Sequence, residues 1–76
     1  MVEAYVTIQT GAGTGPDVLE RLRALKQVKK AHIVAGEFDI IAEVEAESEQ
    51  DLLSLITEEV QTLEGVGRTS TCIILE

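Results

Sequence analysis

The chain has 76 residues, enough for one small domain that would bury about 60% of the surface its unfolded chain exposes. Fourteen acidic against six basic residues give a net charge of −8, a balance that repels phosphate backbones and argues against direct binding of nucleic acid. No apolar run approaches the roughly 20 residues that cross a bilayer. No basic segment typical of a signal peptide follows Met1. We therefore expect a cytoplasmic protein with no membrane partner.

The inventory of reactive side chains is small. Cys72 is the only cysteine and His32 the only histidine, so the sequence offers neither a disulfide framework nor a thiolate metal site. We expect Cys72 to be a buried small hydrophobic residue and His32 to lie on an edge strand. With no tryptophan and a single tyrosine, the composition favours a non-enzyme without cofactor or metal.

The first half of the chain predicts a strand followed by a helix. Residues 2–10 alternate between apolar and mixed side chains, as in a half-buried strand. The glycine-rich residues 11–15 then break the chain, without the lysine of a phosphate-binding loop. Pro16 suits the first helical position. The apolar positions of this helix are Val18, Leu19, Leu22 and Leu25.

The central residues 31–44 contain two apolar, β-rich runs on either side of Gly36-Glu37. This arrangement predicts a tight hairpin with a two-residue turn, because glycine accepts the positive φ that such a turn requires. The strand before the turn should run from Gln27 to Val34, and the strand after it to about Ala46.

The second half predicts another helix and strand. Ser48, followed three residues later by Asp51, is typical of a helix start. Helical spacing links Leu52, Leu55, Ile56, Val60 and Leu63, and we expect the helix to end at Gly65. The last strand should run from Gly67 to Leu75.

The two halves repeat one pattern at an offset of 38 residues, which aligns Val2 with Ile40. Each half reads strand, helix, strand. Two such units joined by a hairpin predict an α+β, ferredoxin-like βαββαβ fold with an antiparallel four-stranded sheet in the order 4-1-3-2 and both helices on one face.

The repeat also indicates which sheet face the helices cover. The residues expected to meet the helices are Val2, Ala4, Val6, Ile40, Ala42 and Val44. The residues expected on the open face are Tyr5, Ile41, Ile73, Leu75 and either Ile33 or its neighbours. An open face with this much apolar area predicts sheet-to-sheet self-association.

Two motifs resemble a known family. They are Val28-x-x-Ala31-x-x-Val34-x-Gly36-x-Phe38-Asp39-Ile40-Ile41 and Leu63-x-Gly65-Val66-x-x-Thr69-x-Thr71-x-Ile73. Together they resemble the effector-binding domain of the Lrp/AsnC feast/famine transcription regulators, also called the RAM module, over essentially the whole chain 1–76. The resemblance implies homodimers of the dimeric α+β barrel type that join into rings such as octamers or decamers. It also implies a small effector, usually an amino acid, bound between dimers near the Gly-x-x-Asp hairpin.

The main departure from the family pattern is that Met1 leads directly into the first strand. The sequence thus resembles the single-domain form without a helix-turn-helix domain, which would influence transcription only through a full-length Lrp/AsnC partner. Phe38 stands where tyrosine is frequent and Ala35 where threonine is frequent, so both lack a hydroxyl.

The resemblance implies that the ligand-binding residues are Ala35, Gly36, Phe38, Asp39, Thr69 and Thr71. The backbone at Gly36 and the carboxylate of Asp39 could accept an α-amino group, and the two threonine hydroxyls could meet an α-carboxylate. Each residue also has an ordinary explanation: a turn glycine, an aspartate bonded to the hairpin backbone, and threonines favoured by β-propensity.

Two other classes share the expected fold. An ACT-type regulatory domain also binds amino acids, but it would use the loop from Gly11 to Asp17. An enzyme of the dimeric α+β barrel type, related in fold to monooxygenases, is disfavoured by the scarce catalytic residues.

Overall fold

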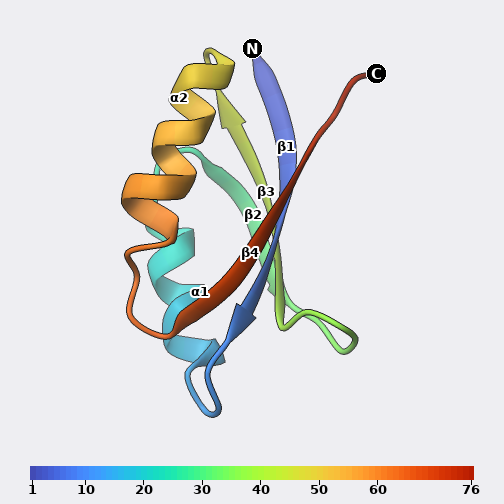
Figure 1. Cartoon of the computed structure of the whole chain (residues 1–76). Helices are drawn as coiled ribbons and strands as arrows, with labels where there is room; N and C mark the ends of the chain where they lie inside the picture. The colour runs from blue at the N-terminus through green and yellow to red at the C-terminus, as the bar shows by residue number, and fades with distance from the viewer.

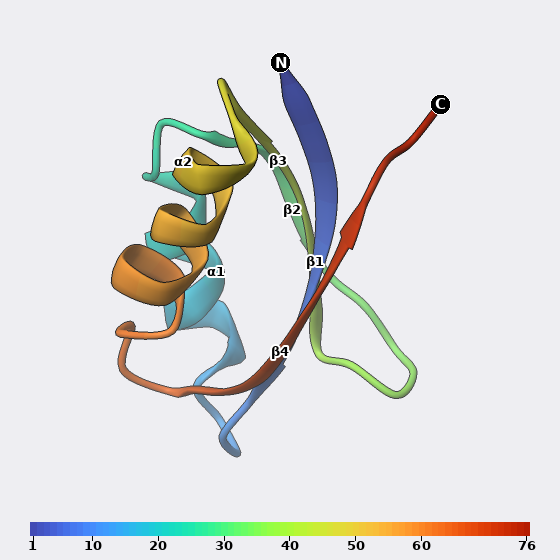
Figure 2. The same ribbon diagram turned by 45° about the horizontal axis from the view of Figure 1, so that its top comes forward.

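Four strands form one antiparallel sheet in the order β2-β3-β1-β4, and the helical segments cover one of its faces (Figures 1 and 2). The computed structural model describes all residues 1–76. Its elements are β1 (Val2–Thr10), α1 (Gly15–Arg23), β2 (Val28–Ile33), β3 (Ile40–Ala46), α2 (Glu49–Ser54), η1 (Leu55–Val60) and β4 (Val66–Ile73). This confirms the predicted ferredoxin-like fold and strand order.

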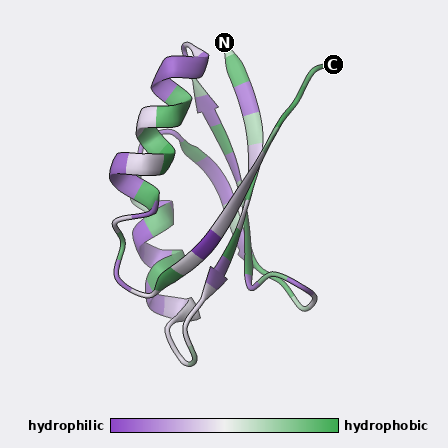
Figure 3. Ribbon diagram, in the orientation of Figure 1, coloured by the Kyte–Doolittle hydropathy of each residue, from purple (hydrophilic) through white to green (hydrophobic).

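The core lies between the sheet and the helices, and it is entirely apolar. Alternate residues are buried from Ala4 to Ile8 in β1 and from Ile40 to Ala46 in β3, as the alternation predicted, and the helices contribute the other large buried side chains. Green apolar and purple polar segments accordingly both occur along β1, β3 and the helices (Figure 3). The buried residues are Ala4, Val6, Ile8, Val18, Leu22, Ala31, Ile40, Ala42, Val44, Ala46, Leu52, Leu55, Ile56 and Val60.

Helix α1 is shorter than its apolar spacing suggested. It begins after Thr14, with Pro16 in the first turn, and ends at Arg23. Leu25 therefore lies beyond the helix, where it packs against the core half-buried. The Arg23 side chain donates from Nε and Nη2 to the carbonyl oxygen of Ala31, at 3.1 and 2.7 Å, which joins the end of α1 to β2.

The second helical segment starts as predicted but ends early. Ser48 Oγ accepts the backbone N–H of Asp51 at 3.1 Å, which confirms the N-cap. The predicted end at Gly65 is wrong, because the helix changes to π-helical hydrogen bonding over η1 and stops at Val60. Gly65 instead lies in the turn before β4 with a φ of +96°, and Leu63 also lies outside the helix.

The faces of β4 differ from the prediction. Ile73 pairs with Ala4 and Thr71 with Val6, and directly opposed residues of antiparallel strands share a face. Ile73 therefore lies on the helix side, not on the open face, and β4 ends there, before Leu75. Alternation places residues on two faces, but only the register against β1 decides which face the helices cover.

The open face carries Tyr5 and Ile41 as predicted, since neither belongs to the buried set of alternate residues. At the β2 edge, Ile33 opposes buried Ile40, so it is the neighbour His32 that shares the open face with Ile41. Cys72 opposes Tyr5 on this face and is exposed, so the expectation that it would be buried is wrong.

Candidate functional site

The connection between β2 and β3 is a six-residue loop, residues 34–39, rather than the predicted two-residue turn. The N–H of Val34 donates to the carbonyl oxygen of Asp39 at 2.9 Å and closes the base of this loop. The N–H of Asp39 donates to the carbonyl oxygen of Ile8 at 3.0 Å. These two hydrogen bonds hold Asp39 against both Val34 and β1. The chain therefore closes at Val34 and Asp39 and does not turn tightly at Gly36.

The carboxylate of Asp39 fixes the loop to the end of β1. Its Oδ2 accepts the backbone N–H of Thr10 at 2.8 Å, next to the bulge between Ile8 and Thr10, while Oδ1 has no hydrogen bond within the chain. Gln9 adds a second link, since its Nε2 donates to the carbonyl oxygen of Glu37 at 3.3 Å. Asp39 thus has a structural role and one carboxylate oxygen still free to accept a donor.

The remaining loop residues present backbone and apolar surface to solvent. Ala35 and Gly36 are exposed, and Phe38 is half-buried. A Cβ added to Gly36 would meet no atom within 4 Å, so the backbone there is open to another molecule. The loop extends from the sheet on the side away from the helices (Figures 1 and 2).

The two threonines lie elsewhere in the protomer. Thr69 and Thr71 oppose Ile8 and Val6, so they share the helix side of the edge strand β4. Thr69 Oγ1 accepts from the amide Nε2 of Gln61 at 3.0 Å. The structure therefore brings Ala35, Gly36, Phe38 and Asp39 together but does not join Thr69 and Thr71 to them within one chain.

An ionic cluster lies on the open face, and its lysine is a residue that sequence patterns did not point to. Lys29 Nζ lies 2.8 Å from Glu45 Oε2 and 3.6 Å from Glu3 Oε2. The hydrogen bond that the Lys29 ammonium donates to Glu45 raises the pKa of Lys29 above its ordinary value, since the carboxylate stabilises the ammonium form. No periodicity marks Lys29 as the partner of these carboxylates, because Lys29 occupies the irregular step between the paired residues Val28 and Lys30.

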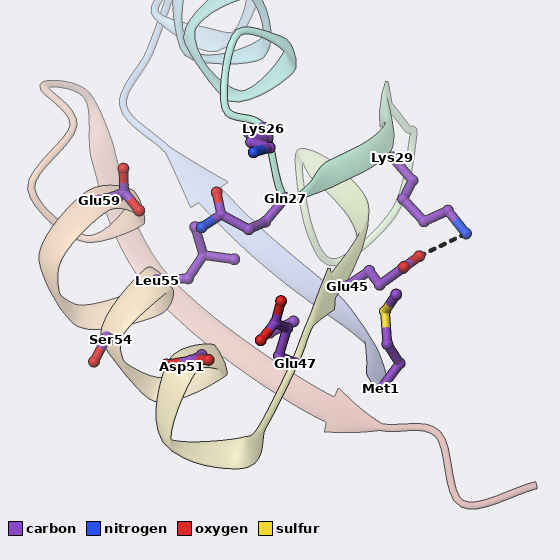
Figure 4. A pocket seen from close by; sticks show the side chains of 11 residues that line it. Met1, Lys26, Gln27, Lys29, Glu45, Glu47, Asp51, Ser54, Leu55 and Glu59 are labelled. Atoms are coloured by element: carbon purple, nitrogen blue, oxygen red, sulfur yellow. Dashed lines mark ion pairs between the residues drawn. The ribbon is translucent and has the colours of Figure 1, made fainter.

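A cavity of about 500 Å³ lies at the opposite end of the sheet from the 34–39 loop (Figure 4). It is bordered by the start of β2, the end of β3 and residues of α2 and η1. None of the residues predicted to bind a ligand lines it.

A model of the Lrp/AsnC ligand binding domain matches residues 3–76. The chain belongs to the Lrp/AsnC family. Its solved relatives include the hypothetical protein PHS023 from Pyrococcus horikoshii, which is 42% identical with a TM-score of 0.93 over 100% of this chain and 93% of that protein. The family assignment confirms the resemblance carried by the two sequence motifs.

Two further relatives are regulatory proteins. A helix-turn-helix-type transcriptional regulator of Pyrococcus furiosus is 32% identical over 92% of this chain and 49% of that protein. The feast or famine regulatory protein Rv3291c from M. tuberculosis, solved in complex with L-methionine, is 30% identical with a TM-score of 0.85 over 100% of this chain and 51% of that protein. The chain thus spans about half the length of the curated relatives it matches. None of its helices is long and apolar enough to cross a membrane.

Proposed function

We propose that this Lrp/AsnC domain is a non-catalytic module that binds an amino acid where its 34–39 loop meets a neighbouring copy. The observation that carries the proposal is the match of the whole chain to a regulator solved with L-methionine. The exposed loop, fixed to β1 by Asp39, supplies the local chemistry.

Within this proposal, Asp39 has two functions. Its Oδ2 holds the loop through the N–H of Thr10, and its Oδ1 accepts the α-ammonium group of the ligand. The open backbone at Gly36 permits close approach, and half-buried Phe38 provides an apolar wall.

The threonines enter the site only through a second copy. Thr71 is exposed on an edge strand, so the hydroxyl of a neighbouring copy is free to meet the ligand carboxylate. This requirement makes the site dependent on assembly. The apolar residues of the open face, Tyr5 and Ile41, support a sheet-to-sheet dimer as the unit from which larger rings form.

A role in transcription follows if the module joins an assembly with a full-length regulator. The curated relatives that it matches are transcriptional regulators about twice its length. The net charge of −8 disfavours direct contact of this domain with DNA. The module would therefore change the assembly or ligand response of a partner that itself binds DNA.

Calorimetry with the common amino acids, run beside light scattering of the same samples, tests this function. Replacement of Asp39 by alanine is ambiguous, because it also removes the acceptor for the Thr10 N–H. Asp39→Asn keeps an amide oxygen for that N–H but removes the charge. It should weaken ligand binding about tenfold or more, since a hydrogen bond to a charged group contributes about 1.5–3 kcal/mol.

Asp39→Asn should leave the melting temperature nearly unchanged, whereas Asp39→Ala should lower it. A ligand that binds Asp39→Asn as tightly as the original chain, and is lost on substitution within residues 11–17, would replace this site with an ACT-like one. That loop is already tied to its surroundings, since the N–H of Gly11 donates to the carbonyl oxygen of Gly65 at 3.0 Å.

A further inference from the structure

The cavity at the end of β3 opposite the 34–39 loop is large enough for a small molecule and is lined by charged side chains that have no part in the loop site. The seven residues of β3 separate it from the 34–39 loop by roughly 20 Å. Its volume of about 500 Å³ falls within the range of sites that bind small molecules.

The side chains around the cavity are opposed in charge. Lys26 and Gln27 lie on one side, and Glu47 and Asp51 on the other (Figure 4). Buried Leu55 lies between them and, with Ala46, supplies an apolar floor.

Most of these polar groups have no partner inside the chain. The one ion pair at the cavity joins Lys29 to Glu45 (Figure 4). Six other polar side chains line the space without a hydrogen bond or ion pair: Lys26, Gln27, Glu47, Asp51, Ser54 and Glu59. Gln27 and Ser54 are only partly exposed, but no buried side-chain polar atom in the chain lacks a partner, so these unpaired groups are solvated and free to bind a ligand.

The charge count specifies the kind of ligand. The lining side chains have four carboxylates and two ammonium groups, and Met1 adds the N-terminal ammonium. Pairing of Lys29 with Glu45 leaves three carboxylates against two ammonium groups. A ligand that satisfies this lining carries more amino groups than carboxylates, together with an apolar stem for the floor.

We propose that this cavity is a second small-molecule site and that it takes a basic amino acid, a molecule with two amino groups, one carboxylate and a methylene chain. Lys26 and Gln27 bind the carboxylate, and the amino groups reach the carboxylates of α2 and η1. The site is formed within one protomer, so it does not depend on the loop site or on assembly.

Titration of the ¹⁵N-labelled intact chain with L-lysine tests the proposal, and two ligands serve as controls. Norleucine lacks the second amino group, and cadaverine lacks the carboxylate. Lysine should shift the amide signals of Gln27, Ser54 and Leu55 at concentrations where norleucine does not. Equal shifts with both ligands, or no shift with lysine, overturn the proposal.

Matched variants test which side chains of the cavity bind lysine. Glu59→Gln should weaken lysine binding about tenfold, whereas Glu58→Gln, the same change at the adjacent exposed position outside the cavity, should not. Lys26→Gln should weaken binding of lysine but not of cadaverine. Unchanged binding in Glu59→Gln contradicts the site.

The loop variant Asp39→Asn separates the two proposed sites. If it abolishes the lysine-induced shifts while Glu59→Gln has no effect, lysine binds at the loop and the cavity site is wrong. If it leaves these shifts intact, the cavity binds independently, whatever the outcome for the loop.

Discussion

Gly65 connects the turn before β4 to the loop before α1, and its replacement by alanine gives a quantitative test of the packing. It has a φ of +96°, where an alanine is strained by about 1–2 kcal/mol. An added Cβ would also lie 2.9 Å from Thr14 Cβ and 3.1 Å from Val18 Cγ2. Val18 is completely buried, so it has little room to move.

Gly13 is the matched control. Its φ of +77° imposes similar backbone strain, but an added Cβ would meet no atom within 4 Å. We expect Gly13→Ala to lower the free energy of unfolding by about 1–2 kcal/mol. Gly65→Ala adds an overpacking cost of about 1–3 kcal/mol, for a total of about 2–5 kcal/mol.

Urea denaturation at one fixed protein concentration measures both variants, since the proposed assembly would make stability depend on concentration. At about 4–8 °C per kcal/mol for a domain of this size, Gly65→Ala should also melt well below Gly13→Ala. Equal losses in the two variants would show that the contacts of Gly65 with Thr14 and Val18 are not restrictive, and the packing argument would fail.

Three other predictions follow from the described contacts. Ile41→Asp should dissociate the proposed sheet-to-sheet assembly in light scattering, because an unpaired charge in a dry interface is costly. Leu53→Asp, an equal change at an exposed position of α2, should not, and dissociation by both would contradict the proposed interface. Ser48→Ala should lower the free energy of unfolding by about 1 kcal/mol through loss of the helix N-cap, and an unchanged urea midpoint would show that the cap is unimportant. The raised pKa of Lys29 means that its pairing stabilises the fold fully below pH 10.5, and that this contribution is lost as the pH rises through the folded-state pKa. Glu45→Gln should move the pKa of Lys29 back toward 10.5 in an NMR titration. An unmoved pKa would rule out Glu45 as the cause.

The sequence by itself determined the elements whose side chains have one clear periodicity. Strand β1 runs from Val2 to Thr10 as predicted, because strict alternation of apolar residues defines a half-buried strand. The sequence also predicted the Ser48 cap, because a hydrogen bond between residues three apart depends only on local geometry. The repeated pattern then limited the topology to one fold.

Long-range hydrogen bonds decided what the sequence could not. In β4, apolar and hydroxyl side chains occupy both faces, so alternation carries little information there, and the pairing of Ile73 with Ala4 sets the face. The prediction of a tight hairpin was wrong because Asp39 bonds to Thr10 of β1, which is 29 residues away in the sequence.

Tertiary structure also decided the composition of both candidate sites. It placed Thr69 and Thr71 on the helix side, away from the loop that the motif joins them to. It gathered the unpaired polar groups that precede β2, follow β3 and lie on the second helical segment around one cavity that no local spacing reveals. Local patterns fix which residues share an element, whereas the contacts between elements fix which residues share a site.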